Sequence, residues 1–345
     1  DWSSDVCSSD LDAKFWFIDN FTPKYNWKPT PTEETSRYKS DNKSFTYLWD
    51  NYFLFDHTFA EKHRVGLMAG MSAQWNTNDY LNAQKNVFMF DNVHEMDNGE
   101  EMYAIGGNET EWALLSYMAR VNYSYEDRYL LTATIRRDGS SRFGKENKWG
   151  TFPSAAFAWR VNQESFLRDV SWIDNLKLRV SYGIVGNQNG IGNYTTLGLA
   201  DNKGYEFGDV FQMGYLPGKE LSNPNLKWEQ SATANFGLDF SFFNGRLNGT
   251  VEYYNTHTKD LLVKRSLNAS LGYTTMLDNL GKTKSSGIDL SLNGDVVRMK
   301  EFTWTLGTNF SMYKNEIVRI DDTLDENGKP ASQVAQGWII GEPIN

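Results

Sequence analysis

The chain has 345 residues, a net charge of −10 and an aromatic content of 15%. The excess of acids over bases argues against a nucleic-acid partner, which would need a basic patch. No run of about 18 apolar residues occurs, so no transmembrane helix is expected. The single cysteine, Cys7, cannot form an internal disulfide and offers no metal cluster.

The first segment of the chain, residues 1–11 (DWSSDVCSSDL), reads unlike the sequence after it. It resembles a translated sequencing adapter, and we therefore expect it to be non-native and outside the fold. The other end, GEPIN at residues 341–345, stops without a strand that carries a terminal aromatic residue. We expect the chain to be a fragment.

From residue 12 onward, the main signal is strict alternation of apolar and polar residues. Residues 232–242 and 302–312 each place aromatic and aliphatic side chains at every second position, with polar residues between them. A period of two predicts a β-strand with one apolar face and one polar face that contacts water. Strands of about ten residues with aromatic ends are typical of outer-membrane β-barrels. We predict ten strands: 45–58, 64–75, 113–125, 129–137, 151–161, 176–186, 229–242, 246–256, 284–294 and 302–313.

The links between these strands alternate in length, as they do in a barrel with short periplasmic turns and long extracellular loops. The short links are 59–63, 126–128, 162–175, 243–245 and 295–301, and the long links are 76–112, 138–150, 187–228 and 255–283. Asn244-Gly245 is also a strong hairpin signal. Arg120 and Arg179 fall on the polar register of their strands, so the sequence predicts a partial transmembrane antiparallel β-barrel. A soluble β-sandwich also alternates and is the alternative fold.

Signatures of enzymes and metal sites are mostly absent. The four histidines, His57, His63, His94 and His257, lie far apart in the sequence. The acidic stretch DDTLDENG at 321–328 is similar to a calcium loop, but Val334 stands where the bidentate glutamate belongs. A solvated loop is the better interpretation, and a loose calcium site stays the alternative. We predict no catalysis and no cofactor.

A set of short motifs carries a family resemblance. They are, in chain order, RRDGSSRFG at 136–144, FPSA at 152–155, LKLRVSYG at 176–183, GNQ at 186–188, NPNLKWE at 223–229, Tyr253-Tyr254 with DLL at 260–262, NLG at 279–281 and GIDL at 287–290. In this order and spacing, residues 13–345 resemble the C-terminal half of the barrel of SusC/RagA-type TonB-dependent outer-membrane transporters. Each motif alone is weak, and for each we favour a structural role in turns and strand ends over a role in substrate binding.

The resemblance implies a 22-stranded barrel in the outer membrane of a Gram-negative bacterium, closed by an N-terminal plug domain. It implies import driven by the TonB–ExbB–ExbD complex, with a SusD-like surface lipoprotein as a lid. The substrate class implied is oligosaccharide, and in some members peptide. Residues 12–345 would then be a partial barrel domain without the plug, the TonB-contacting segment and the final strands.

Sugar binding needs aromatic faces for stacking, and amides or carboxylates for hydrogen bonds to hydroxyl groups. The predicted extracellular loops offer candidates of this kind: Trp75, Tyr80, Asn82, Trp149, Tyr194, Tyr205 and Tyr215. For each one, packing against other loops or the lid protein is the competing role. A passive porin and a soluble carbohydrate-binding β-sandwich protein stay as alternative functions.

Overall fold

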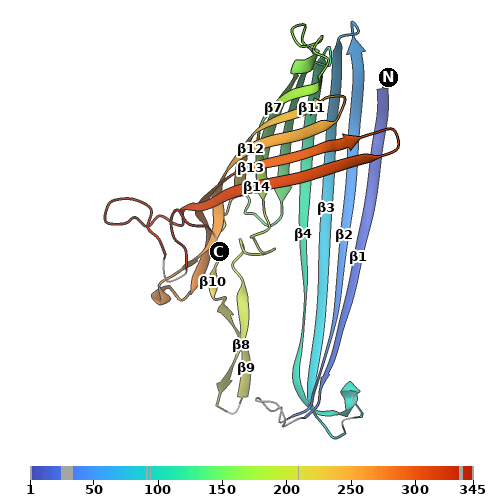
Figure 1. Ribbon diagram of the computed structural model, residues 1–345. Coiled ribbons are helices and arrows are strands. Elements are labelled where there is room, and N and C mark those ends of the chain that lie inside the picture. Colours follow the sequence, from blue (N-terminus) through green and yellow to red (C-terminus); the bar gives the residue numbers. More distant parts are fainter. Residues whose placement is uncertain are drawn as a thin grey trace. The chain divides into compact units, whose positions relative to one another are not determined.

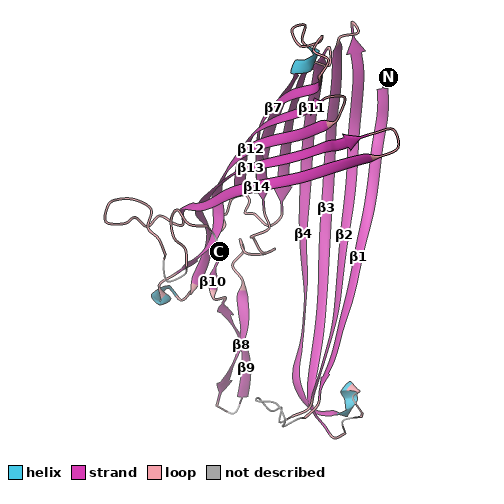
Figure 2. Cartoon of the chain, in the orientation of Figure 1, coloured by secondary structure: helices cyan, strands magenta, loops and turns pink. Residues whose placement is uncertain are grey.

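The computed structural model describes residues 2–24, 34–90, 92–93, 95–208, 210–333 and 337–343, without the side chains of residues 2–7 and Ala269. Asp1, His94 and Val334 lie outside the described residues, and so does the side chain of Cys7. Almost every described segment is a strand, and the helices are three single-turn 3₁₀ helices (Figure 2). Among these residues, no helix has the length and the apolar composition that a membrane-spanning helix needs.

The described part of the chain contains 14 strands. They are β1 (Trp2–Thr22), β2 (Ser36–Phe59), β3 (His63–Phe88), β4 (Gly99–Tyr125), β5 (Tyr129–Ser140), β6 (Trp149–Arg160), β7 (Ile173–Asn187), β8 (Ala200–Phe207), β9 (Val210–Pro217), β10 (Glu220–Leu221), β11 (Glu229–Phe242), β12 (Leu247–Ser266), β13 (Thr275–Arg298) and β14 (Thr303–Arg319). The 3₁₀ helices are η1 (Met96–Asn98), η2 (Val161–Gln163) and η3 (Ala269–Leu271).

One sheet contains 12 of these strands, and each long strand lies beside its neighbours along the chain (Figure 1). The order is β1 to β7, then β11 to β14, with the short β10 parallel to β13. The ladders from β5 to β14 are antiparallel wherever long strands pair. Strands β8 and β9 form a separate hairpin. A single meandering sheet of this kind rules out the two packed sheets of the β-sandwich alternative.

Two compact units make up the chain. The larger unit contains residues 1–6, 51–71 and 116–345, and thus all of β5 to β14. The smaller unit contains residues 7–50 and 72–115, which come from β1 to β4 and their connections. Each is described by itself below.

All ten predicted strands are present and a short connection follows where each short link was predicted, although β7 already begins at Ile173 and β13 continues to Arg298. The turns at residues 60–62 and 126–128 are each built on two residues with positive φ, Ala60 with Glu61 and Glu126 with Asp127. The amide of Arg128 donates to the carbonyl of Tyr125 at 2.9 Å, which closes the second turn. Two positive φ angles in sequence are the geometry of type I′ turns, whose twist matches that of antiparallel strands. The Asn244-Gly245 turn has the same property, with a φ of 54° and 74°.

The prediction was wrong about the extent of two long links. Residues 76–88 continue β3 and residues 99–112 belong to β4, so the loop between these strands covers only residues 89–98. Likewise β12 continues to Ser266 and β13 begins at Thr275. The sequence analysis also missed β1 and the β8–β9 hairpin. The structure places residues 2–11 in β1, and their expected non-native origin stays a prediction.

The two faces of the sheet differ sharply in chemistry. On β14, one face carries Leu306, Phe310 and Met312, which are 59%, 56% and 60% exposed in the isolated chain. The residues between them are small or polar, and Ser311 donates a hydrogen bond to Asp289 on the neighbouring strand. An apolar face that no other part of the described chain covers is expected where a strand meets lipid. The opposite face is polar and carries the ion pairs described below.

We expect Leu290→Arg, on the apolar face of β13, to destabilise the folded protein by about 2–4 kcal/mol because it places a charge in the bilayer. The neighbouring substitution Ser291→Arg, on the polar face, is the matched control and should cost much less. The temperature at which the folded band disappears on an unboiled SDS gel measures the difference. Equal losses in both variants would show that the faces are assigned wrongly.

Candidate substrate-facing surfaces

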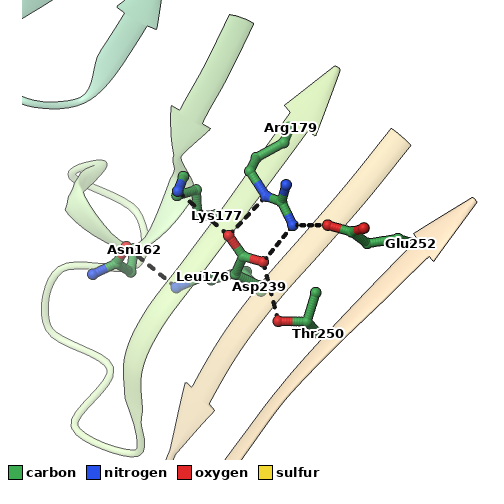
Figure 3. Close-up of polar contacts among 7 residues, drawn as sticks. All are labelled: Asn162, Leu176, Lys177, Arg179, Asp239, Thr250 and Glu252. Carbon is green, nitrogen blue, oxygen red and sulfur yellow. Dashed lines mark hydrogen bonds and ion pairs between the residues drawn. The ribbon is translucent and has the colours of Figure 1, made fainter. Parts of the chain in front are cut away.

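The polar face of β7, β11 and β12 holds a network of charged residues centred on Asp239 (Figure 3). The Nε and Nη2 atoms of Arg179 donate to the two Asp239 oxygens at 2.9 and 2.8 Å. Arg179 also contacts the Glu252 carboxylate, and Lys177 Nζ lies 3.4 Å from Asp239 Oδ2. Thr250 donates to Asp239 Oδ1 at 3.2 Å. The prediction that Arg179 lies on the polar register is thus confirmed.

The strand register explains why this network forms. Gly237 on β11 stands between Arg179 on β7 and Glu252 on β12 in one cross-strand row. A Cβ atom at Gly237 would lie 2.9 Å from Arg179 Cζ, so the missing side chain leaves room for the guanidinium. A bidentate arginine–carboxylate pair fixes direction as well as charge. The network therefore holds the polar side chains of three strands in a defined arrangement.

A second cluster joins the motifs that carry the family resemblance. The rings of Phe143 and Trp228 stack at 4.7 Å between centroids, and Phe152 packs edge-on against Trp228 at 5.5 Å. Leu226 is fully buried. These residues come from segments up to 85 positions apart in the sequence and form the main apolar core of the larger unit. Packing in this core is enough to explain why these positions carry large apolar residues, without a ligand.

Close backbone contacts and hydrogen bonds fix the same cluster. Asn147 Nδ2 donates to the carbonyl of Asn225 at 2.9 Å, and Trp228 Nε1 donates to the carbonyl of Lys148 at 3.2 Å. A Cβ atom at Gly144 would lie 2.1 Å from the carbonyl oxygen of Pro224. The turn after β5 and the segment before β11 therefore form one packed unit. This supports the structural role that we predicted for these motifs.

The structure places two of the predicted site residues on the apolar face. Trp75 lies on β3 in register with Leu67, and its ring centroid is 6.4 Å from that of Tyr47. Trp149 begins β6, stacks on Tyr117 at 6.0 Å and lies under the guanidinium of Arg137 at 5.5 Å. Both contacts fit an aromatic girdle at the edge of a membrane. A role of these two residues in substrate binding stays an untested prediction.

Tyr80 and Asn82 lie together on the opposite, polar face of β3, within the smaller unit. The hydroxyl oxygens of Tyr80 and Tyr38 are 2.8 Å apart, and Asn82 donates to the Tyr80 hydroxyl. An aromatic hydroxyl beside an amide is the kind of surface that could bind a sugar. These two predicted residues are thus neighbours, and Tyr38 is a third member that the sequence analysis missed.

The other predicted residues lie in the connection between β7 and β11. Tyr194 is in the loop after β7, whereas Tyr205 and Tyr215 lie on the hairpin β8–β9 and are 53% and 75% exposed. Their register places Tyr205 and Tyr215 on opposite faces of the hairpin. The same hairpin exposes Phe207 and Phe211 by 74% and 64%. The alternation of aromatic residues around Gly208 could have revealed this hairpin.

The described residues contain no group of three or more histidine, cysteine, aspartate or glutamate side chains that could hold a metal ion. In the acidic loop, Asp325 Oδ1 accepts from the amides of Asn327 and Lys329 at 2.8 and 2.9 Å. Asp321 Oδ1 accepts from the amide of Thr323 at 2.9 Å. These carboxylates thus bind the backbone of their own loop.

Comparison with known proteins identifies the family. The sequence model described as "TonB dependent receptor-like, beta-barrel" matches residues 1–336. TonB-dependent receptor P39 of Formosa agariphila is 36% identical over 285 residues, covering 81% of this chain and 27% of that protein. TonB-dependent receptor SusC of Bacteroides thetaiotaomicron is 42% identical over 217 residues, covering 61% of this chain and 21% of SusC. A structure of the RagAB peptide transporter matches 98% of this chain and 37% of the solved chain, with a TM-score of 0.85 and 25% identity.

The chain therefore belongs to the TonB-dependent receptor β-barrel family and is of the SusC/RagA type. It spans about a quarter of the length of the curated relatives it matches. The family is one of outer-membrane transporters rather than enzymes, and the sheet is the wall of a transmembrane β-barrel. The apolar face described above is thus the outer, lipid-facing surface, and the polar face is the interior surface.

We expect Gly144→Ala to loosen the segment before β11, because the new Cβ atom would displace the carbonyl of Pro224. Limited proteolysis should then cleave within residues 188–228 several-fold faster than in the parent protein. Gly198→Ala is the matched control, since its Cβ atom would meet only Ser222 Oγ at 3.7 Å. Unchanged cleavage in Gly144→Ala would show that this contact does not hold the segment.

The periplasmic connection between β6 and β7 yields a pH-dependent prediction. Tyr129 donates to Glu164 Oε1 at 2.6 Å and Trp159 donates to the same atom at 3.0 Å. These hydrogen bonds, with the charge of Arg128, hold the pKa of Glu164 below its usual range. A carboxylate with a lowered pKa stabilises the fold above its unfolded pKa and loses that effect as pH falls through the folded pKa.

Glu164→Gln should therefore lower the thermal midpoint at neutral pH. The difference from the parent protein should shrink as the pH falls below the ordinary glutamate pKa of about 4, because the unfolded chain takes up a proton there before the folded protein does. Unboiled SDS gels of samples heated at each pH measure both midpoints. A difference that stays constant down to pH 3 would show that ionised Glu164 does not stabilise the turn.

Proposed function

We propose that the protein to which this chain belongs imports a nutrient across the outer membrane, energised through TonB, and that the nutrient is an oligosaccharide. The resemblance to SusC/RagA-type transporters, which implies an oligosaccharide, is supported by the 42% identity to SusC over 217 residues. Peptide is the second candidate, because a RagAB structure described as a peptide transporter is 25% identical and has a TM-score of 0.85.

The observation that carries the proposal is the charged interior surface of the barrel wall. Arg179, Asp239 and Glu252 line it with hydrogen-bonding groups, whereas the outer face of the same strands is apolar. A polar barrel interior is suited to a hydrated solute and unsuited to a lipid. This supports translocation of a polar molecule through the barrel.

The hairpin β8–β9 supplies groups that suit the recognition of sugars. Tyr205 and Tyr215 expose ring faces that can stack on pyranose rings. Asn202, directly opposite Tyr215, offers an amide to sugar hydroxyl groups. The hairpin is part of the connection on the side of the barrel away from the short turns, which is the extracellular side in this class of barrel.

A SusD-like surface lipoprotein is the proposed partner. The exposed apolar residues Phe207, Phe211 and Met213 support it, because an isolated two-stranded hairpin is marginally stable in water. The proposed contact with TonB–ExbB–ExbD would lie in parts of the protein other than this chain.

The test is uptake of labelled oligosaccharide by cells that carry the full-length protein and its neighbouring lipoprotein gene. Uptake should disappear when TonB is deleted, whereas persistent uptake would indicate a passive porin. In binding assays with the purified complex, Tyr215→Ala, on the hairpin face that also carries Asn202, should weaken oligosaccharide binding by about threefold, the loss of about one stacking contact. Phe166→Ala removes an exposed aromatic residue from a periplasmic turn and should leave binding unchanged. Binding of peptides alone would replace the substrate class.

A further inference from the structure

Uncharged polar residues fill one face of β3 along the part of the strand farther from the short turn at residues 60–62. Alternate residues of a strand share a face, and this face is opposite to the one that carries Trp75 and Leu81. It therefore lies on the interior side of the sheet. We call it the amide face; it consists of Gln74, Asn76, Asn78, Tyr80, Asn82 and Gln84, all of them half-buried.

Hydrogen bonds to β2 confirm that these side chains share one face within the smaller unit. Asn76 Nδ2 donates to Ser44 Oγ at 3.1 Å and to Thr46 Oγ1 at 2.9 Å. Four residues further along β3, the hydroxyl oxygens of Tyr80 and Tyr38 are 2.8 Å apart. The even-numbered positions of β2 from Tyr38 to Thr46 all carry hydroxyl or amide groups. The neighbouring strand thus extends the uncharged polar surface.

Strand β4 extends it on the other side. A Cβ atom at Gly106 would lie 3.2 Å from Asn82 Oδ1, so the even-numbered positions of β4 belong to the same face. From Ala104 to Trp112 none of these positions is charged. Because Gly106 has no side chain, the surface beside Asn82 is open. The three strands, which are neighbours in the sheet (Figure 1), together present one broad neutral surface.

The charges of this unit lie mainly on the opposite face. Arg37 donates to both oxygens of Asp19 at 2.8 and 2.7 Å, and Lys39 Nζ lies 3.5 Å from the same carboxylate. Strand β1 adds one ion pair to the interior side, Asp12 with Lys14 at 2.9 Å, which has no net charge. In a chain with 23% charged residues, a merely solvated surface would not exclude charge from three neighbouring strands. The exclusion indicates a surface for a neutral solute.

The chemistry of the amide face matches sugar hydroxyl groups. A side-chain amide has two N–H donors and an acceptor with two lone pairs, so these residues can bond to each other and also to a ligand. Tyr38 and Tyr80 add aromatic rings on which a pyranose can stack. From Gln74 to Gln84 the face extends over ten residues, about 33 Å of strand, which is enough for several sugar rings.

Two other solutes fit this surface less well. A carboxylated or sulfated glycan would call for arginine or lysine, and Arg37 and Lys39 lie on the other side of the sheet and face Asp19. An extended peptide is bound mainly through its backbone at the edge of a sheet. Strand β3 has no such edge, because it is paired with β2 and β4.

We propose that the amide face binds the transported solute and that this solute is a neutral oligosaccharide. The proposal rests on the proposed function and narrows its substrate class to glycans without acidic groups. It also assigns a glycan-binding role to β2, β3 and β4, in addition to the β8–β9 hairpin.

The experiment measures the binding of hexasaccharides of glucose, mannose and galactose to the full-length protein by titration calorimetry. Each is used neutral and with its primary hydroxyl groups oxidised to carboxylates. The parent protein should bind a neutral hexasaccharide more tightly than its oxidised form. Asn78→Asp/Asn82→Asp should weaken neutral binding by about tenfold, as expected for two lost hydrogen bonds. Asn78→Lys/Asn82→Lys should reverse the preference in favour of the oxidised glycan.

The matched control is Thr77→Asp/Ala83→Asp, which adds the same charge to the opposite face of the same strand. It should bind as the parent protein does, and an equal loss in this variant would overturn the role of the amide face. Where Asn78→Asp/Asn82→Asp does not fold, Asn78→Ser/Asn82→Ser replaces it and should lose binding several-fold.

The outcomes also separate this proposal from the proposed function. A parent protein that prefers the oxidised glycans, with binding unchanged in the amide-face variants, would overturn the neutral site and leave oligosaccharide import intact. A parent protein that binds no glycan in either form would overturn both the neutral site and the proposed substrate class.

Discussion

The constraint on which this structure depends is the pairing of backbone groups in a medium without water. Inside a bilayer, an unpaired amide or carbonyl costs several kcal/mol, so each spanning strand must be hydrogen-bonded on both sides. Strand β11 shows the result, since it pairs along almost its whole length with β7 on one side and β12 on the other. Once the backbone is paired in this way, successive side chains must point alternately to the lipid and to the barrel interior. The period of two in the sequence is a direct record of that constraint.

The interior surface follows from the same alternation. Side chains that point away from lipid are brought into cross-strand rows, so charged residues on three strands meet without any loop to position them. Gly237 shows how one position adjusts such a row, because its missing side chain gives space to Arg179 between Asp239 and Glu252. The cost of these charges is moderated by water inside the barrel, since they are not sealed in a low-dielectric core. The interior can therefore be strongly polar while the protein stays embedded in lipid.

The sequence predicted the fold where the two faces differ and failed where they do not. Strands such as β11 were placed correctly because one face reads as a run of alanine, leucine and phenylalanine. Residues 76–88 of β3 have polar residues on both faces, so their sequence reads as a loop although the backbone ladder continues. The candidate site residues rest on a different kind of reasoning, and their role in binding stays a prediction. Trp75 and Trp149 were chosen by residue type and presumed loop position, and the parity of their strands would have placed them on the apolar face. Tyr80 and Asn82 are two positions apart on β3, so the continued strand places them on one face, where Asn82 donates to the Tyr80 hydroxyl.

The motifs that carry the family resemblance form a buried cluster, apart from the exposed hairpin that we propose as a substrate contact. Phe143, Phe152 and Trp228 are buried against each other, and Gly144 allows close contact with Pro224. Such a cluster constrains sequence tightly because every member packs against the others. The exposed hairpin β8–β9 lies between the segments of this cluster in the sequence. Its side chains are not packed in this way, so substitutions there should cost the fold little. A packed cluster beside an exposed hairpin separates the residues that the fold needs from those that are free to contact a solute.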